Sequence, residues 1–287
     1  MRAELRWRLL IAPGVVALLY VVFVIALLAQ EQELVYAARW SRSGTDTTLA
    51  AGWRRIALVT SDGLRLDAVV AAPVGPHRAT VLYLHGNAAS IWSGQVRDKL
   101  LGYQQLGYRV LALDYRGYGI NPGAPSERGF LADAMAGAQY TEDSLRIRPS
   151  ELVIHGMSLG SGVAAAVAVQ RPPRLLILDG AYTSLPDVAA EAYPWVPVHL
   201  LMRNRFPTLA RLDSIRSPIL IVHAVNDEVV PFHFGERLAA ATKTPTWFLR
   251  TEGGHVAGAF ADPQRFGWEL DGILTPPEQR TWGWWGP

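Results

Sequence analysis

The chain has 287 residues, of which 50% are hydrophobic and 18% are charged, so its composition excludes a disordered or fibrous protein and fits one large globular domain or two small ones. Cysteine is absent, which excludes disulfide bonds, a cysteine nucleophile, a thiolate zinc site and an iron–sulfur cluster. The 27 basic and 25 acidic residues give a formal net charge of +2 without forming a dense basic patch, so we expect no nucleic acid partner.

The first predicted element is an apolar helix. Residues 9–29 run for 21 positions without a charge, and a helix of that length just crosses the hydrocarbon layer of about 30 Å. We therefore predict a transmembrane anchor in residues 1–30 that contacts the membrane through residues 9–29. Arginines precede the span and glutamates follow it, which predicts a cytoplasmic N-terminus and a catalytic domain on the non-cytoplasmic side. A cleaved signal peptide is the alternative, although its apolar region normally has only about 7 to 15 residues.

A polar linker at residues 31–52 leads into a domain that we place at residues 53–287. In this domain, short runs of valine, isoleucine and leucine alternate with longer segments of helical spacing. Several runs are apolar throughout, as is typical of strands buried on both faces of a parallel sheet. We predict eight strands, at residues 55–60, 64–71, 80–84, 109–113, 152–155, 175–178, 219–223 and 246–250.

The segments of helical spacing fall between these strands. They predict helices at residues 93–106, 126–143, 159–170 and 234–241. Residues 181–215 interrupt the alternation with four prolines among aromatic side chains, which indicates a short lid-like insertion over the edge of the sheet. The predicted fold class is α/β, with a mostly parallel eight-stranded sheet flanked by helices.

The loop after the third predicted strand is a candidate anion-binding turn. Gly86, Asn87 and Ala88 follow that strand directly, and such a small-residue turn can direct a backbone N–H group at a reacting carbonyl. We predict that the N–H group of Asn87 is this donor, with Ala88 as the alternative. For His85 we predict a structural role, in which its ring holds the loop.

Residues 156–160 read Gly-Met-Ser-Leu-Gly and join the fifth predicted strand to a predicted helix. In this G-x-S-x-G turn, side chains at the two glycine positions would collide, and the serine is left exposed at the start of the helix. The helix dipole and free N–H groups stabilise negative charge there. We predict Ser158 as a nucleophile and the N–H group of Leu159 as the second donor of an oxyanion hole.

Partners for this serine follow two later strands. His255 comes after the eighth predicted strand and two glycines, and Asp227 comes after the seventh. A serine hydroxyl needs a nearby base, and that base needs a carboxylate that fixes its tautomer. We predict His255 as the base and Asp227 as its carboxylate, with Glu228 and Asp179 as the alternatives. The order Ser, Asp, His is that of α/β-hydrolases.

Together these segments resemble the α/β-hydrolase superfamily, and the chain is most similar to a branch of membrane-anchored serine hydrolases that includes protein depalmitoylases and lysolipid hydrolases. The resemblance implies the α/β-hydrolase fold, a small or lipid-like acyl ester as substrate, and neither a metal nor an organic cofactor. The segments that carry it are residues 85–88, 113–119, 156–160, 227–231 and 253–255.

The sequence therefore predicts a membrane-anchored serine hydrolase that cleaves carboxylic ester or thioester bonds through an acyl-enzyme. Two alternatives remain. One is a serine peptidase or amidase on the same fold, and the other is a non-catalytic protein that uses this fold for binding.

Overall fold

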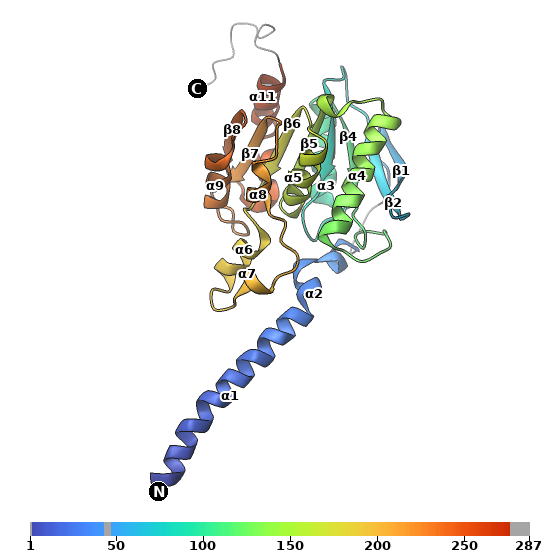
Figure 1. The fold of residues 1–287 in the computed structure, drawn as a ribbon. Coiled ribbons are helices and arrows are strands. Elements are labelled where there is room, and N and C mark those ends of the chain that lie inside the picture. The colour runs from blue at the N-terminus through green and yellow to red at the C-terminus, as the bar shows by residue number, and fades with distance from the viewer. Residues whose placement is uncertain (1, 43–46, 276–287) are drawn as a thin grey trace.

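The structure is a computed structural model that describes residues 2–42 and 47–275, with only the backbone described for residues 2–12 and 42. An α/β domain forms the body of the protein, and the long helix α1 (Arg2–Ala29) projects away from it (Figure 1). Two short elements, α2 (Glu31–Val35) and the 3₁₀ helix η1 (Ala38–Arg42), lie between α1 and this domain.

The sheet has eight strands in the order β1-β2-β4-β3-β5-β6-β7-β8, which confirms the predicted fold class. β1 and β2 form an antiparallel hairpin at one edge, β2 is antiparallel to β4, and the other pairs are parallel. The strands are β1 (Trp53–Val59), β2 (Arg65–Ala71), β3 (Ala79–Leu84), β4 (Tyr108–Leu113), β5 (Leu152–Met157), β6 (Leu175–Asp179), β7 (Ile219–Ala224) and β8 (Thr246–Thr251).

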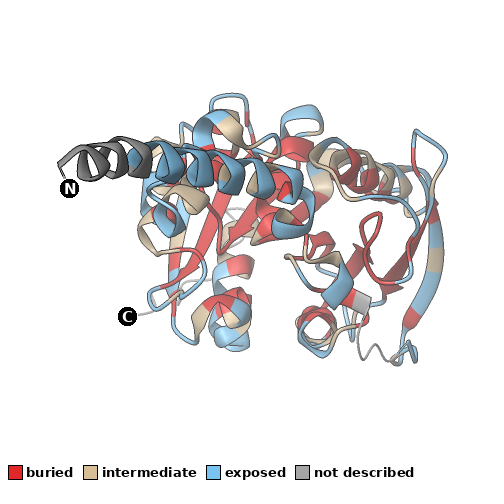
Figure 2. Ribbon diagram, turned by 90° about the horizontal axis from the view of Figure 1, so that it is seen from below, coloured by how far each residue is buried: buried red, intermediate tan, exposed pale blue. Residues whose placement is uncertain are grey.

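Neighbouring residues of a strand point to opposite faces of the sheet. Since both faces of this sheet carry apolar side chains, helices cover both of them. In β5, Ile154 belongs to one buried apolar cluster, together with residues of three helices, α4 (Glu127–Asp143), α5 (Leu159–Gln170) and α9 (His233–Ala241). The preceding residue, Val153, belongs to a second cluster with residues of α3 (Gly94–Gln105) and α11 (Pro263–Leu274). The inner strands are accordingly buried between two helical layers, as Figure 2 shows in red, whereas the edge strands β1 and β8 are partly exposed.

The lid-like insertion predicted at residues 181–215 lies between β6 and β7. It contains three short helices, α6 (Leu185–Ala192), α7 (Val198–Leu201) and α8 (Thr208–Leu212). α6 and α7 lie at the end of the domain from which α1 projects (Figure 1). Tyr20 of α1 donates a hydrogen bond to the carbonyl of Trp195 at 2.9 Å, and the rings of Phe23 and Trp195 lie 5.4 Å apart. The insertion therefore packs against α1.

Helix α1 exposes large apolar side chains along its described part, among them Val16 (65% exposed), Leu18 (63%) and Leu19 (62%). Nevertheless, within residues 2–42 and 47–275 we find no helix whose length and apolar character suffice to cross a membrane. The predicted span at residues 9–29 has no support from this structure, and neither has the orientation derived from it.

Candidate active site

The predicted nucleophile Ser158 lies between the end of β5 and the start of α5. Its φ of 50° and ψ of −121° are strained for a residue with a side chain, as expected at a tight strand-to-helix turn. A Cβ atom added to Gly156 would lie 2.3 Å from the Gly160 carbonyl oxygen, and one added to Gly160 would lie 2.1 Å from that of Leu84. The turn therefore requires glycine at both positions.

The structure brings Ser158, His255 and Asp227 together in one line. His255 Nε2 lies 2.8 Å from Ser158 Oγ, and His255 Nδ1 lies 2.7 Å from Asp227 Oδ2. Since a carboxylate accepts a hydrogen bond from Nδ1–H, Nε2 is left to accept the serine proton. Burial opposes the charge of Asp227, yet hydrogen bonds from His255 and from the N–H groups of Val229 and Val230 hold its pKa below the ordinary value.

The loop that carries His255 is held by side chains of α3 and β6. Lys99 Nζ of α3 donates to the carbonyls of Val256 and Ala257 at 2.6 and 3.0 Å. Asp179, at the end of β6, accepts a hydrogen bond from the N–H group of Ala259 at 3.0 Å. Asp179 therefore binds the backbone of this loop. The carboxylate that contacts the His255 ring is that of Asp227.

Glu228, the other alternative for that carboxylate, contacts the same loop at its backbone. Its Oε2 atom accepts a hydrogen bond from the N–H group of His255 at 3.3 Å. The two glycines before His255 have φ values of 101° and 75°, which only glycine adopts easily. Of the three predicted candidates, it is Asp227 that reaches the imidazole ring.

The loop after β3 lies directly against the nucleophile. A Cβ atom added to Gly86 would lie 3.2 Å from Ser158 Cβ, so glycine permits this close approach. Within the described part of the chain, the backbone N–H groups of Asn87 and Leu159 have no hydrogen-bond partner. Both N–H groups are thus free to donate to an anion, and Leu159 directly follows Ser158 in the chain. The side chain of Asn87 has a separate role, because it binds backbone groups of residues 35 and 37.

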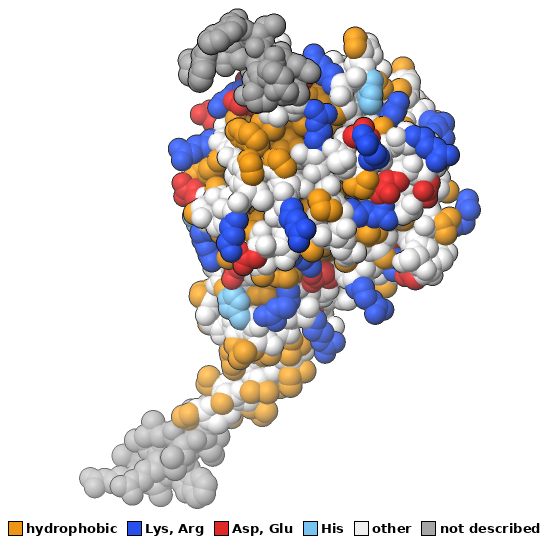
Figure 3. All heavy atoms as spheres, turned by 45° about the horizontal axis from the view of Figure 1, so that its top comes forward, with side chains coloured by type: hydrophobic (Ala, Val, Ile, Leu, Met, Phe, Trp, Pro, Cys, Tyr) orange, Lys and Arg blue, Asp and Glu red, His pale blue; other side chains and the backbone are white. Residues whose placement is uncertain are grey.

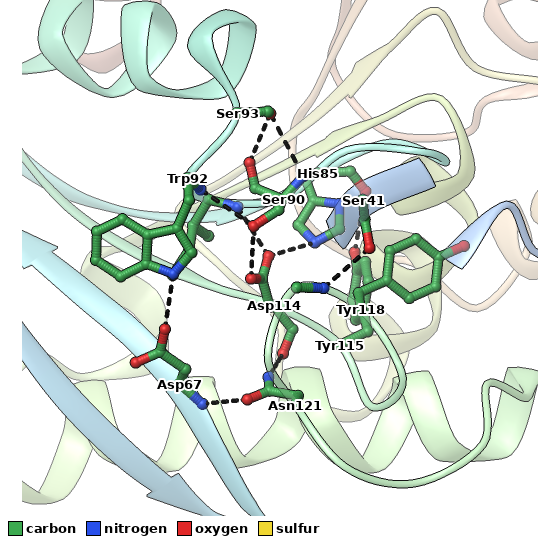
Figure 4. A network of polar contacts seen from close by, with 12 residues as sticks. Ser41, Asp67, His85, Ser90, Trp92, Ser93, Asp114, Tyr115, Tyr118 and Asn121 are labelled. Atoms are coloured by element: carbon green, nitrogen blue, oxygen red, sulfur yellow. Dashed lines mark hydrogen bonds and ion pairs between the residues drawn. The ribbon is translucent and has the colours of Figure 1, made fainter. Parts of the chain in front are cut away.

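A buried polar network fixes the far half of this loop, and sequence reasoning did not single it out (Figure 4). Asp114, which follows β4, is fully buried and accepts hydrogen bonds from the Ile91 N–H group at 2.8 Å and from Ser90 Oγ at 2.7 Å. His85 Nε2 lies 3.3 Å from Asp114 Oδ1, and His85 is fully buried as well. Its place in the network agrees with the structural role predicted for it.

A further aspartate–histidine pair joins β5 and β6. His155 Nε2 is 3.3 Å from Asp179 Oδ2, and the Tyr103 hydroxyl lies 2.6 Å from His155 Nδ1. All three side chains are fully buried. Burial opposes the charge of Asp179, but the hydrogen bond from His155 and the nearby charges of His155 and Lys99 keep its pKa below the ordinary value. In the described ranges, no group of three or more His, Asp or Glu side chains is arranged to hold a metal ion.

Comparison with known proteins agrees with this fold. A family model described as the alpha/beta hydrolase fold matches residues 79–209. The Mycobacterium tuberculosis protein Rv2307c is 34% identical over 253 residues, which cover 87% of this chain and 89% of that protein. The Arabidopsis thaliana alpha/beta hydrolase domain-containing protein WAV2 is 30% identical over 206 residues, which cover 66% of this chain and 67% of that protein. The chain therefore belongs to the alpha/beta hydrolase family.

Two further relatives carry a named activity. The lysophosphatidylserine lipase ABHD12 of Danio rerio is 37% identical over 178 residues, which cover 55% of this chain and 46% of the lipase. The chain therefore spans about half the length of that relative. The structure of the Pyrococcus furiosus esterase Pf2001 is 21% identical, with a TM-score of 0.63 over 77% of this chain and 91% of the esterase, a likeness of fold.

Proposed function

We propose that the protein is a serine hydrolase that cleaves carboxylic ester or thioester bonds through an acyl-enzyme. The observation that carries this proposal is the continuous hydrogen-bonded line from Asp227 through His255 to Ser158. Such a line provides a nucleophile, a base and a group that orients the base, which are the three parts that acyl transfer requires.

In the first half of the proposed reaction, Ser158 Oγ attacks the acyl carbon while His255 Nε2 accepts its proton. The N–H groups of Asn87 and Leu159 stabilise the oxyanion that forms. The C–O or C–S bond then breaks, and His255 returns the proton to the leaving alcohol or thiol. The acyl group remains on Ser158 as an ester.

In the second half, a water molecule gives its proton to His255 Nε2 and attacks the acyl-enzyme. The proton passes from His255 to Ser158 Oγ as the carboxylic acid leaves, so the site returns to its starting state. Asp227 stabilises the positive charge on His255 in both halves, and its lowered pKa keeps it ionised for that purpose.

For the substrate, we infer an ester with an apolar acyl chain, and for the protein an association with lipid. The names of the relatives support this inference, since they include a lysophosphatidylserine lipase and an esterase. A second support is α1, whose exposed apolar side chains are visible along its described part in Figure 3. Burial of such side chains in lipid removes apolar area from water, which favours attachment to a membrane.

Labelling by a fluorophosphonate probe tests the proposal. We expect the full-length protein to react with the probe and the Ser158→Ala variant not to react. Hydrolysis of p-nitrophenyl esters of increasing chain length, of a matched thioester and of a matched anilide then defines the scissile bond. A folded wild-type protein that takes no label would contradict the serine hydrolase, and preferred cleavage of the anilide would indicate an amidase.

A further inference from the structure

Residues 31–42, which comprise α2, η1 and the two residues between them, lie against the loop that carries Asn87. We call this segment the N-terminal strap. Asn87 Oδ1 accepts a hydrogen bond from the Ala37 N–H group at 2.9 Å, and Asn87 Nδ2 donates to the Val35 carbonyl at 2.9 Å. A carboxamide that pairs with both a donor and an acceptor of one segment fixes the loop relative to that segment.

The strap is itself held to the domain along its length. At its start, Glu31 is 8% exposed, and its carboxylate accepts hydrogen bonds from the backbone N–H group of Asn204 at 2.9 Å and from the side-chain amide of Asn204 at 3.1 Å. In the middle, Tyr36 is 3% exposed and its hydroxyl donates to Asn204 Oδ1 at 2.7 Å. At its end, Ser41 Oγ accepts from the Gly119 N–H group at 2.9 Å. The strap is thus a fixed support for Asn87.

The loop has a backbone conformation that needs such support. Ala88, the neighbour of Asn87, has a φ of 57°, and residues other than glycine keep such values where their surroundings impose them. The far half of the loop is fixed by Asp114 through Ile91 (Figure 4). The near half is held through the side chain of Asn87, which contacts the strap and the hydroxyl of Tyr118.

We propose that the N-terminal strap positions the oxyanion loop, with the Asn87 carboxamide as the positioning group for the Asn87 backbone N–H donor. The proposal rests on the serine hydrolase function proposed above. Because Gly86 packs against Ser158, a small displacement of the next residue changes the distance from its N–H group to the developing oxyanion. Loss of the strap contact therefore weakens transition-state stabilisation more than ester binding, so kcat falls while KM changes little.

The variant Ala37→Pro removes the donor to Asn87 Oδ1 without altering any proposed catalytic residue. Tyr36, the preceding residue, has a φ of −111° and a ψ of 104°, an extended conformation that a following proline favours. We expect kcat of the full-length protein for p-nitrophenyl butyrate to fall about tenfold to hundredfold, somewhat less than for loss of a whole oxyanion donor. The control Ala37→Ser keeps the N–H group and should keep the wild-type kcat.

A second readout separates this positioning role from general loosening. The pH dependence of kcat/KM reports on His255 and should stay unchanged in Ala37→Pro, and Tm should stay near that of Ala37→Ser. A wild-type kcat in Ala37→Pro, or equal losses in both variants, would overturn the proposal. Should Ala37→Pro not fold, Asn87→Ala decides in its place, because it removes both strap hydrogen bonds and should lower kcat with KM unchanged.

The failure of this inference can be told apart from failure of the proposed function. If wild-type Ser158 takes no fluorophosphonate label, the serine hydrolase is refuted. If Ser158 is labelled and the wild-type protein hydrolyses the ester, but Ala37→Pro does so at the same rate, only the role of the strap is refuted.

Discussion

Two of the aspartate–histidine pairs in this sheet differ in the group that lies next to the second nitrogen of the histidine ring. In the pair of Asp227 and His255, that nitrogen lies 2.8 Å from the hydroxyl of Ser158. In the pair of Asp179 and His155, it lies 2.6 Å from the hydroxyl of Tyr103, inside the core. The same two residue types thus form a proposed catalytic pair in one place and a buried structural pair in the other.

The second pair nevertheless supports the first. The backbone carbonyl of Asp179 accepts the Ser158 N–H group at 2.8 Å, and its carboxylate accepts that of Ala259 in the loop after His255. One residue therefore joins the nucleophile turn to the loop of the base. The difference between the pairs teaches that, of two neighbouring aspartates, one can bind the imidazole of His255 while the other binds the backbone of the two loops.

The largest expected effect distinguishes Ser158 from a nearby serine, Ser161, in helix α5. Ser158→Ala should lower kcat for p-nitrophenyl esters by about 10⁴-fold or more, because the triad acts as a unit. Ser161 is fully buried three residues later, and its hydroxyl has no hydrogen-bond partner among the described residues. Ser161→Ala is therefore the matched control and should retain wild-type kcat. Near-normal turnover by Ser158→Ala would refute the nucleophile.

The next effect compares the two aspartates directly. Asp227→Asn should lower kcat by about 10³- to 10⁴-fold, because an amide does not stabilise the charged imidazole and favours the wrong tautomer. Asp179→Asn should lower kcat less than tenfold, since Asp179 contacts only the backbone of the site. Steady-state kinetics of both purified variants measure this difference. Equal losses would show that the two carboxylates act together in catalysis.

His155→Phe should change stability more than catalysis. It leaves the fully buried Asp179 without its imidazole partner, and breaking a buried pair in this way destabilises a protein by about 3 to 5 kcal/mol. Urea unfolding should show that loss, while kcat at 25 °C falls less than tenfold in the folded protein. A large fall in kcat with unchanged stability would assign His155 to the chemistry.

A smaller effect depends on pH. Burial lowers the pKa of His223, despite its hydrogen bond to the Val230 carbonyl and the nearby charge of Asp227. As the pH falls below about 6.5, His223 is therefore protonated in the unfolded chain but still neutral in the folded chain. The free energy of unfolding consequently decreases as the pH falls. The contribution to the slope is at most about 1.4 kcal/mol per pH unit for one proton.

Urea unfolding between pH 7.5 and 5.5 measures this slope. His223→Gln should have a shallower slope than the wild-type protein, because glutamine does not titrate. The control His199→Gln changes an exposed histidine and should leave the slope as it is. Parallel slopes for wild type and His223→Gln would contradict the assignment.

A structural feature of this protein could be predicted from the sequence when its interacting residues lie close together along the chain. The turn at Ser158 is local, since a strand, two glycines and a helix occur within one stretch, and all eight strands were predicted within a few residues. The carboxylate that binds the His255 ring could be chosen among Asp227, Glu228 and Asp179 only from the structure, because all three contact His255 or its loop. The prediction of a membrane span found no support in the described residues.

The N-terminal strap could not be predicted for a different reason. Residues 31–52 look like a polar linker in sequence, and Asn87 finds its partners Val35 and Ala37 about 50 positions away. Tyr36 reaches Asn204 across 168 positions. Such contacts between distant segments leave no periodic or motif signal, whereas the apolar runs of the strands do.

The central claim is that Ser158 carries an acyl group during turnover. Rapid mixing of the full-length protein with a p-nitrophenyl ester, acid quenching and peptide mass spectrometry test it most directly. We predict an acyl adduct of the mass of the acid on the peptide that contains Ser158, and none in the Ser158→Ala variant. Turnover by the folded protein with no adduct, or with an adduct on another residue, would contradict the account.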